Sequence, residues 1–148
     1  MKAVIQRVSS ASVTVDSEKI SCIGEGLLIL LGVVQEDVEK DIDYLAKKTA
    51  GLRIFKDDSH NMNLSVQDVG GEALVVSQFT LCADTQRGRR PSFVNAAEPK
   101  MAEILYDRYC KKLQLQNIHV SRGQFGAMMD VELINDGPVT IILNSRSG

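Results

Sequence analysis

Residues 26–34 form the longest apolar run in the chain, and this run constrains the fold more than any other feature. In its middle, residues 27–31 lack the alternation of polar and apolar side chains that a half-exposed strand shows. Such a segment is typical of a strand that is covered on both faces. The run is shorter than the roughly 18 apolar residues of a membrane span, so we expect a core strand and no membrane association.

Other apolar patterns predict a mixture of helices and strands. Asp37 is expected to cap a helix that ends near Gly51, because apolar residues recur between them at three- and four-residue spacing. A second helix is expected over residues 99–113, with Pro99 in its first turn and two lysines in its last. Further strands, separated by breaks at 9–11, 70–71 and 135–138, are expected over residues 3–8, 12–15, 19–23, 52–55, 73–81, 129–133 and 139–143.

The order of these elements bears on the fold class. The chain carries no internal repeat, low-complexity tract or linker that would divide its 148 residues. Its hydrophobic content of 44% is ordinary for a globular domain, and the helical and strand patterns are mixed along the chain. These features predict a single α+β domain spanning residues 1–148.

Several common chemistries lack the residues that they require. His60 and His119 stand apart from other candidate ligands, and Cys22, Cys82 and Cys110 form no CxxC pair, so we expect reduced thiols and no metal site. The phosphate-loop, dinucleotide-binding and G-x-S-x-G motifs do not occur in the sequence, and we expect no cofactor. The first residues lack the pattern of a secretory signal, which favours a cytoplasmic protein.

Positive charge is concentrated at one place. The formal net charge is −2, so the chain does not bind nucleic acid through an overall basic field. Arg87, Arg89 and Arg90 lie together in a segment whose composition is typical of a loop. Two interpretations are open for this cluster: a solvated surface turn, or a local contact with the phosphates of an RNA.

Two polar segments interrupt the apolar patterns. Residues 77–81 read Ser-Gln-Phe-Thr-Leu after an apolar strand pattern, and residues 135–140 read Asn-Asp-Gly-Pro-Val-Thr. Polar groups inside a strand are costly unless they find partners or a substrate. A strand end that satisfies its own hydrogen bonds, and an ordinary turn with a Gly-Pro bond that can be cis, explain the same residues. Chemistry alone leaves a binding site and a purely structural role both open.

The two segments resemble the signature motifs SQFTL and NxGPxT of the D-aminoacyl-tRNA deacylase (D-tyrosyl-tRNA deacylase) family, and both motifs are matched in full. The resemblance covers nearly the whole chain and includes Gln6-Arg7-Val8, Gly26-Leu27-Leu28, Leu31-Gly32-Val33, Leu52-Arg53-Ile54-Phe55, Arg90-Pro91-Ser92-Phe93 and Phe125-Gly126-Ala127. The chain departs from the family at Asp16-Ser17, where glycine is common, and at Arg122-Gly123, where Thr-Gly is common.

This resemblance implies a β-barrel-like α+β domain, with two main amphipathic helices packed on antiparallel and mixed sheets, that forms a homodimer. It implies hydrolysis of the ester bond between a D-amino acid and the 3′-terminal adenosine of tRNA. The family rejects L-aminoacyl-tRNA and can also remove glycine that is mischarged on tRNA(Ala). Aminoacylated tRNA is therefore the expected partner.

The resemblance also implies the residues of the site. The catalytic segment would comprise Ser77, Gln78, Phe79 and Thr80. A cis Gly137-Pro138 peptide would reach this segment from the partner subunit, across the dimer interface. Arg7 is expected near Gln78, which it would help to fix. The remaining substrate-binding and chirality-selecting residues would be Asn135, Thr140, Phe125 and Met129.

An aminoacyl ester is already activated, so its hydrolysis requires mainly an oriented water and stabilisation of the developing oxyanion, which backbone amides can supply. Thr80 has no general base near it in the sequence, which favours positioning over covalent catalysis. In the family, the vicinal 2′-hydroxyl of the terminal ribose is implicated in assisting the reaction. The alternatives are a noncatalytic tRNA-binding or editing relative and a generic esterase that uses Cys82 or Ser77.

Overall fold

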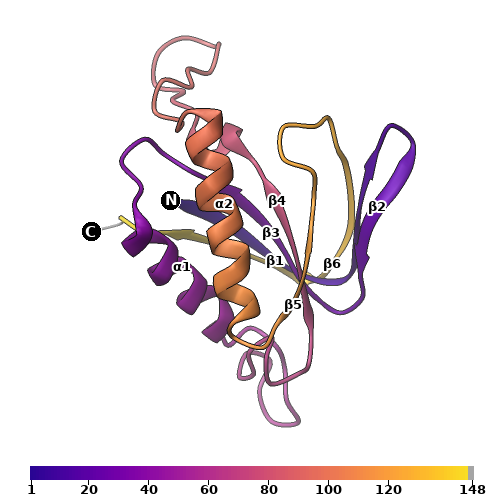
Figure 1. Cartoon of the computed structure of the whole chain (residues 1–148). Coiled ribbons are helices and arrows are strands. Elements are labelled where there is room, and N and C mark those ends of the chain that lie inside the picture. Colours follow the sequence, from indigo (N-terminus) through magenta and orange to yellow (C-terminus); the bar gives the residue numbers. More distant parts are fainter. Residues whose placement is uncertain (147–148) are drawn as a thin grey trace.

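A computed structural model describes residues 1–146 of the chain, and its sheet is organised around the N-terminal strand (Figure 1). This strand, β1 (Lys2–Val15), pairs antiparallel with β2 (Glu18–Ile23) and β3 (Gly26–Gly32). It also pairs antiparallel with β6 (Asp130–Asn144). The strand β4 (Glu72–Ser77) pairs parallel with β3, and β5 (His119–Arg122) pairs parallel with β4. The sheet is therefore mixed, with the apolar strand β3 between β1 and β4.

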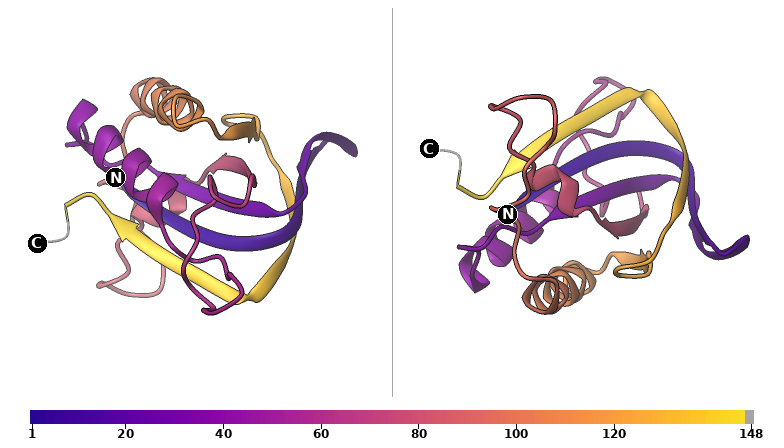
Figure 2. Two further views of the ribbon diagram at one scale, coloured as in Figure 1. Left: turned by 90° about the horizontal axis from the view of Figure 1, so that it is seen from below. Right: turned by 90° about the horizontal axis from the view of Figure 1, so that it is seen from above.

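Both long helices cover the same side of this sheet (Figures 1 and 2). They are α1 (Glu39–Gly51) and α2 (Pro99–Gln114), each with one buried apolar stripe, and Pro99 lies in the first turn of α2 as predicted. The hydroxyl groups of Thr49 on α1 and Tyr109 on α2 share a buried hydrogen bond of 2.8 Å. This contact, together with the apolar stripes, fixes the two helices against each other.

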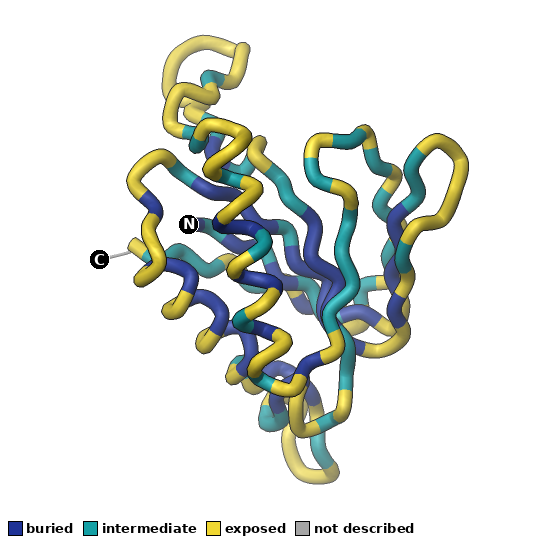
Figure 3. Tube along the Cα trace, viewed as in Figure 1, coloured by how far each residue is buried: buried dark blue, intermediate teal, exposed yellow. Residues whose placement is uncertain are grey.

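The prediction that the apolar run forms a strand covered on both faces is confirmed. Leu27, Ile29 and Leu31 of β3 belong to the core cluster beneath the helices. Leu28, which points the other way, belongs to a second cluster formed mainly by β1, β3 and β4. Partly buried residues of β6 pack against this second cluster, so the sheet curls around it. The buried parts of the strands are dark blue in the centre of Figure 3. The predicted barrel-like α+β fold is confirmed.

Several predicted strand boundaries are wrong. The expected break at residues 9–11 is an irregularity inside the continuous strand β1, because the β1–β6 register shifts between Val8 and Ser10 without ending the pairing. Residues 52–55 form no strand, and only Phe55 makes an isolated bridge, with Leu64. The predicted strand over 73–81 ends at Ser77 and continues as a short 3-10 helix. The four-residue strand β5 was not predicted at all.

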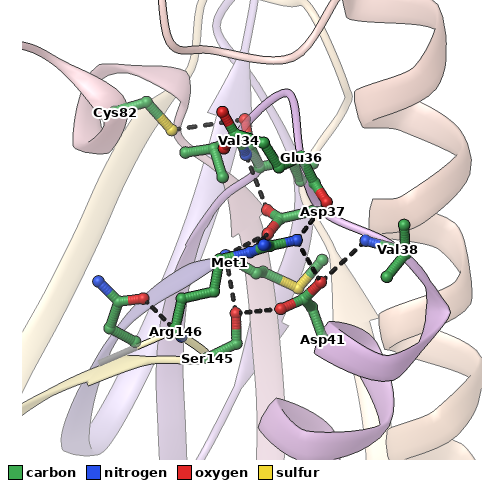
Figure 4. Close-up of polar contacts among 11 residues, drawn as sticks. Met1, Val34, Glu36, Asp37, Val38, Asp41, Cys82, Ser145 and Arg146 are labelled. Carbon is green, nitrogen blue, oxygen red and sulfur yellow. Dashed lines mark hydrogen bonds and ion pairs between the residues drawn. The ribbon is translucent and has the colours of Figure 1, made fainter. Parts of the chain in front are cut away.

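The beginning of α1 also differs from the prediction. Its N-cap is Val38, one residue after Asp37. The Asp37 carboxylate instead accepts hydrogen bonds from the α-ammonium group of Met1 at 2.6 Å and from the Val34 N–H at 2.8 Å. Figure 4 shows this cluster, in which the Ser145 hydroxyl accepts from the Met1 ammonium and donates to Asp41. The cluster ties the start of β1 and the start of α1 to the residues that follow β6.

No helix between residues 1 and 146 is long and apolar enough to cross a membrane. Over the same residues, no group of three or more His, Cys, Asp or Glu side chains is arranged to hold a metal ion.

Candidate functional site

A cavity of about 820 Å³ opens where β4 ends. Its walls come from the 3-10 helix η1 (Phe79–Cys82), the segment before α2, the loop after β5 and the first residues of β6. Five of the predicted site residues line it: Ser77, Gln78, Phe79, Phe125 and Met129. The fold thus brings together side chains that lie about fifty positions apart in the sequence.

The polar segment after Val76 exists because the chain leaves the sheet there. The Gln78 N–H donates to the Leu31 carbonyl at 2.8 Å, beyond the last β3–β4 register pair. The chain then turns into η1, where the Leu81 N–H bonds to the Gln78 carbonyl at 3.2 Å. The Gln78 side-chain amide donates to the Thr80 hydroxyl, which is exposed and does not line the cavity. Gln78 therefore holds Thr80 within the turn.

Aromatic side chains form part of the rim of the cavity. Phe79 is 57% exposed, and its ring meets the Phe93 ring edge to face with 5.0 Å between centroids. Phe93 was not among the site residues predicted from the sequence, although it lies in one of the segments that resemble the family. Only its contact with Phe79 in three dimensions identifies it as a cavity residue.

The Gly-Pro segment lies within one strand and does not separate two strands. In the pairing of β1 with β6, Gln6 is opposite Thr140 and Val8 is opposite Asn135, so the residues from 136 to 139 bulge out of the ladder. The bulge coincides with the sharp bend of β6, drawn in yellow in Figure 2. The Gly137-Pro138 peptide is cis, as predicted, and both residues are exposed.

The polar residues of this segment form a set of hydrogen bonds that holds the bulge. The Asn135 side-chain carbonyl accepts the Val139 N–H at 2.7 Å, and its amide donates to the Thr140 hydroxyl at 3.0 Å. Gly137 has a φ of +137°, and a Cβ on it would lie 2.8 Å from Val139 Cγ2 and 3.1 Å from Arg7 Nη2. Glycine is therefore required at this position.

Arg7 braces the same bulge from β1. Its Nε donates to the Asp136 carbonyl at 2.9 Å, and its Nη1 donates to the Ile54 carbonyl at 2.7 Å. The expectation that Arg7 lies near Gln78 is wrong within the chain. Arg7 pairs with Leu27 near the start of β3, whereas Gln78 bonds to Leu31, four residues and about 13 Å further along that strand.

The two motifs therefore occupy different places on one chain. The cavity has no contribution from the residues of the Gly-Pro bulge and its braces, namely Arg7, Asn135, Gly137, Pro138 and Thr140. The three arginines of the basic cluster, Arg87, Arg89 and Arg90, are all exposed on the loop between the bridge residues Asp84 and Ser92, and they do not line the cavity either.

Cys82 does not have the properties of a nucleophilic cysteine, which is partly exposed and has a lowered pKa. Its side chain is buried, with the residue 3% exposed, and its thiol contacts the Val33 carbonyl at 3.4 Å. Burial raises the pKa of the Cys82 thiol, which reduces the fraction of reactive thiolate. The alternative of a thiol esterase that uses Cys82 is therefore disfavoured.

Comparisons with solved structures agree with this architecture. A protein described as c-Myc DNA Unwinding Element Binding Protein superposes with a TM-score of 0.93 at 42% identity, covering 99% of this chain and 100% of that one. A probable eukaryotic D-amino acid tRNA deacylase has a TM-score of 0.85 at 15% identity, covering 96% of this chain and 97% of its own, a likeness that concerns the fold alone.

Comparisons with protein sequences define the family. The family described as D-Tyr-tRNA(Tyr) deacylase matches residues 4–144. Proteins named D-aminoacyl-tRNA deacylase are 56% identical in Desulfatibacillum aliphaticivorans, over 99% of this chain and all of the relative. The relative of that name in Roseiflexus castenholzii is 61% identical, over 98% of this chain and 92% of its own length. The chain belongs to the D-Tyr-tRNA(Tyr) deacylase family.

Proposed function

We propose that this protein is a hydrolase that cleaves the ester bond between a D-amino acid and the 3′-terminal adenosine of tRNA. The observation that carries this proposal is the presence of both family motifs, each in a defined structural setting. Residues 77–79 line the cavity, with Thr80 bonded to Gln78, and residues 135–140 form a braced bulge. The terminal adenosine and the scissile ester would occupy the cavity beside Ser77, Gln78 and Phe79, with Phe125 and Met129 as its walls.

Positioning accounts for the chemistry better than a covalent intermediate does. The first N–H groups of a helical turn have no acceptor within the turn, so the start of η1 offers backbone donors for the developing oxyanion. The Thr80 hydroxyl receives a hydrogen bond from the Gln78 amide, which is a donor and cannot remove its proton. An oriented water is then the nucleophile, with assistance from the 2′-hydroxyl of the terminal ribose.

Selection between D- and L-amino acids requires a rigid obstacle, because the two substrates carry the same groups in different directions. We place this obstacle in the exposed Gly137-Pro138 segment of a second subunit in a homodimer. The braces from Arg7 and Asn135 make the segment rigid, and its distance from the cavity of its own chain favours insertion into the cavity of the partner. Glycine has no side chain for the obstacle to exclude, so glycyl-tRNA would also be hydrolysed to some extent.

Contact with the tRNA body would come from Arg87, Arg89 and Arg90, whose exposed loop flanks the segment that leads to Phe93. Aminoacylated tRNA is the partner in this proposal, and the cytoplasm is the compartment in which the reaction takes place. The noncatalytic tRNA-binding relative remains the second candidate, because the same fold and basic loop would serve it.

The test of the function is multiple turnover. A limiting amount of the protein should release many equivalents of free D-tyrosine from D-Tyr-tRNA, whereas a noncatalytic binding protein would release none above the rate without protein.

The shared site can be tested by mixing. Two inactive variants, one altered in the cavity and one at Gly137, should regain activity after their subunits are exchanged if each site needs both chains. Lack of any recovery, with exchange verified by mass, would contradict the intersubunit site.

A further inference from the structure

The two walls of the cavity separate at Val75. The strand β4 pairs with β5 as far as Val75 and Arg122. Beyond this pair, β4 continues beside β3 to Ser77, while the chain after Arg122 leaves the sheet towards Phe125 on the opposite wall. Val76 lines the cavity between these two segments. The geometry at the Val75 carbonyl therefore sets the separation of the two walls at the point where they diverge.

We call the place where β4 and the chain after Arg122 diverge the fork. Tyr106 of α2 contacts both sides of this fork without lining the cavity. Its hydroxyl donates to the Val75 carbonyl at 2.7 Å, and the same carbonyl accepts the Gly123 N–H at 3.0 Å. The Tyr106 ring packs against the ring of Phe125 with 5.9 Å between centroids. The Arg122 guanidinium lies 6.0 Å from the centre of the Tyr106 ring. Tyr106 is 3% exposed, so these contacts are shielded from water.

We propose that Tyr106 is a positioning residue that fixes the width of the cavity. Its hydroxyl holds the β4 side through Val75, and its ring holds the opposite wall through Phe125. The inference rests on the proposed function, in which the ester lies between Ser77 on one wall and Phe125 on the other. Small displacements of groups that orient a reaction reduce its rate strongly, by up to about a hundredfold for a shift on the order of 1 Å.

Replacing Tyr106 with Phe isolates the hydroxyl from the ring. The ring contacts with Phe125 and Arg122 are retained, and the Val75 carbonyl keeps the Gly123 N–H as a donor, so no buried carbonyl loses all its partners. The variant should fold, but the fork should lose one of the two bonds that define it. We expect kcat for D-Tyr-tRNA to fall about three- to tenfold. The KM should change less than about twofold, because the tRNA body is held elsewhere.

Tyr109→Phe is a matched control on the same helix. Tyr109 is also buried, with the residue 0% exposed, but its hydroxyl bonds to Thr49 on α1, away from the cavity. Its removal leaves the buried Thr49 hydroxyl without this partner, so this variant should lose at least as much stability as Tyr106→Phe. Its kcat should nevertheless equal that of the unaltered protein. A purely structural role for Tyr106 would instead make kcat follow stability in both variants.

A second measurement decides the inference independently of activity. Amide hydrogen exchange of Gly123, whose N–H shares the Val75 carbonyl with Tyr106, should be faster in Tyr106→Phe than in Tyr109→Phe after correction for global stability. Equal Gly123 exchange in the two variants would overturn the role of Tyr106, and so would equal kcat. Failure of the unaltered protein to release D-tyrosine would contradict the proposed function instead, and the exchange measurement would still show whether Tyr106 fixes the fork.

Discussion

At the scale of single residues, the Thr80 hydroxyl decides between covalent and positional catalysis. It is bonded to the Gln78 amide and lies outside the cavity lining. Thr80→Ala should therefore lower kcat by misplacing the turn but leave measurable hydrolysis, and Thr80→Ser, which keeps the hydroxyl, should be close to the unaltered protein. Rapid quenching followed by mass spectrometry checks the mechanism. An amino acid covalently attached to Thr80 would contradict positional catalysis.

Gly137 is the residue at which the bulge has least room. An added Cβ would lie 2.8 Å from Val139 Cγ2 and 3.0 Å from Val139 N, at a φ of +137° that other residues rarely adopt. Gly137→Ala should cost about 1–3 kcal/mol in the free energy of unfolding, displace the bulge and reduce D-Tyr-tRNA hydrolysis at least tenfold. Urea unfolding and steady-state kinetics measure the two effects.

Gly51→Ala is the matched control for this substitution. Gly51 ends α1, and a Cβ there would meet no atom within 4 Å. This change should leave activity unaltered and stabilise the protein by a few tenths of a kcal/mol up to about 1 kcal/mol. If Gly137→Ala behaves like Gly51→Ala, the bulge has no part in the reaction.

The residues of the cavity could be predicted in part from the sequence. The polar run after an apolar strand marked residues 77–81 as unusual, but only the resemblance to the family predicted Ser77, Gln78 and Phe79 as site residues. These three residues do line one cavity with Phe125 and Met129. The contact of Arg7 with Asp136 could not be predicted, because it depends on the register of β1 with β6, more than 120 positions away. Local patterns contain no information about such a register.

At the scale of elements, the polar cluster at the start of α1 predicts a dependence of stability on pH. Burial by itself would raise the pKa of Asp41. Hydrogen bonds from Ser145 and the Val38 N–H, together with the charge of Arg146, outweigh this effect, so the pKa of Asp41 is lowered overall. A carboxyl whose folded pKa is lowered stabilises the protein above its unfolded pKa of about 3.9 and loses this contribution as the pH falls through the folded pKa. Stability should therefore decrease steadily below about pH 4.

Asp41→Asn tests this origin of the acid sensitivity. The variant should lose about 1–3 kcal/mol of unfolding free energy at pH 7 and show a flatter dependence below pH 4, measured by urea unfolding at several pH values. Asp43→Asn is the control, because the Asp43 carboxylate is exposed on the same helix and pairs with Lys112 at the surface. Identical pH slopes for Asp41→Asn and the unaltered protein would show that Asp41 is not responsible.

The elements themselves were predicted unevenly, for reasons that the structure makes clear. Both helices and the buried strand β3 were found, because their periodicities are long and unambiguous. The strand β5 has only four residues and depends on pairing with β4, which its own composition does not reveal. The break expected at Asn135 lies inside β6, because β1 pairs with residues on both sides of the bulge and keeps the strand continuous.

At the scale of the whole molecule, the proposed complex with tRNA must form although the net charge of the protein is −2. Replacing Arg87, Arg89 and Arg90 with alanine should raise the apparent KM and flatten the salt dependence of binding. Each lost phosphate contact should reduce the slope of log affinity against log salt by about 0.7–0.9. Replacing Lys40, Lys47 and Lys48, which are exposed on α1, removes the same charge elsewhere and should change the slope little. Equal slopes in both variants would mean that the basic loop is only a solvated turn.

In the proposed function, this chain hydrolyses aminoacyl-tRNA according to the chirality of its amino acid. The most direct measurement compares kcat/KM of the purified protein for D-Tyr-tRNA and L-Tyr-tRNA prepared on the same tRNA, by the release of free tyrosine. We predict rapid, repeated turnover of the D-substrate and release from the L-substrate at the rate without protein, with glycyl-tRNA hydrolysed between these limits. Equal hydrolysis of the D- and L-substrates, or release from neither, would contradict the proposed function.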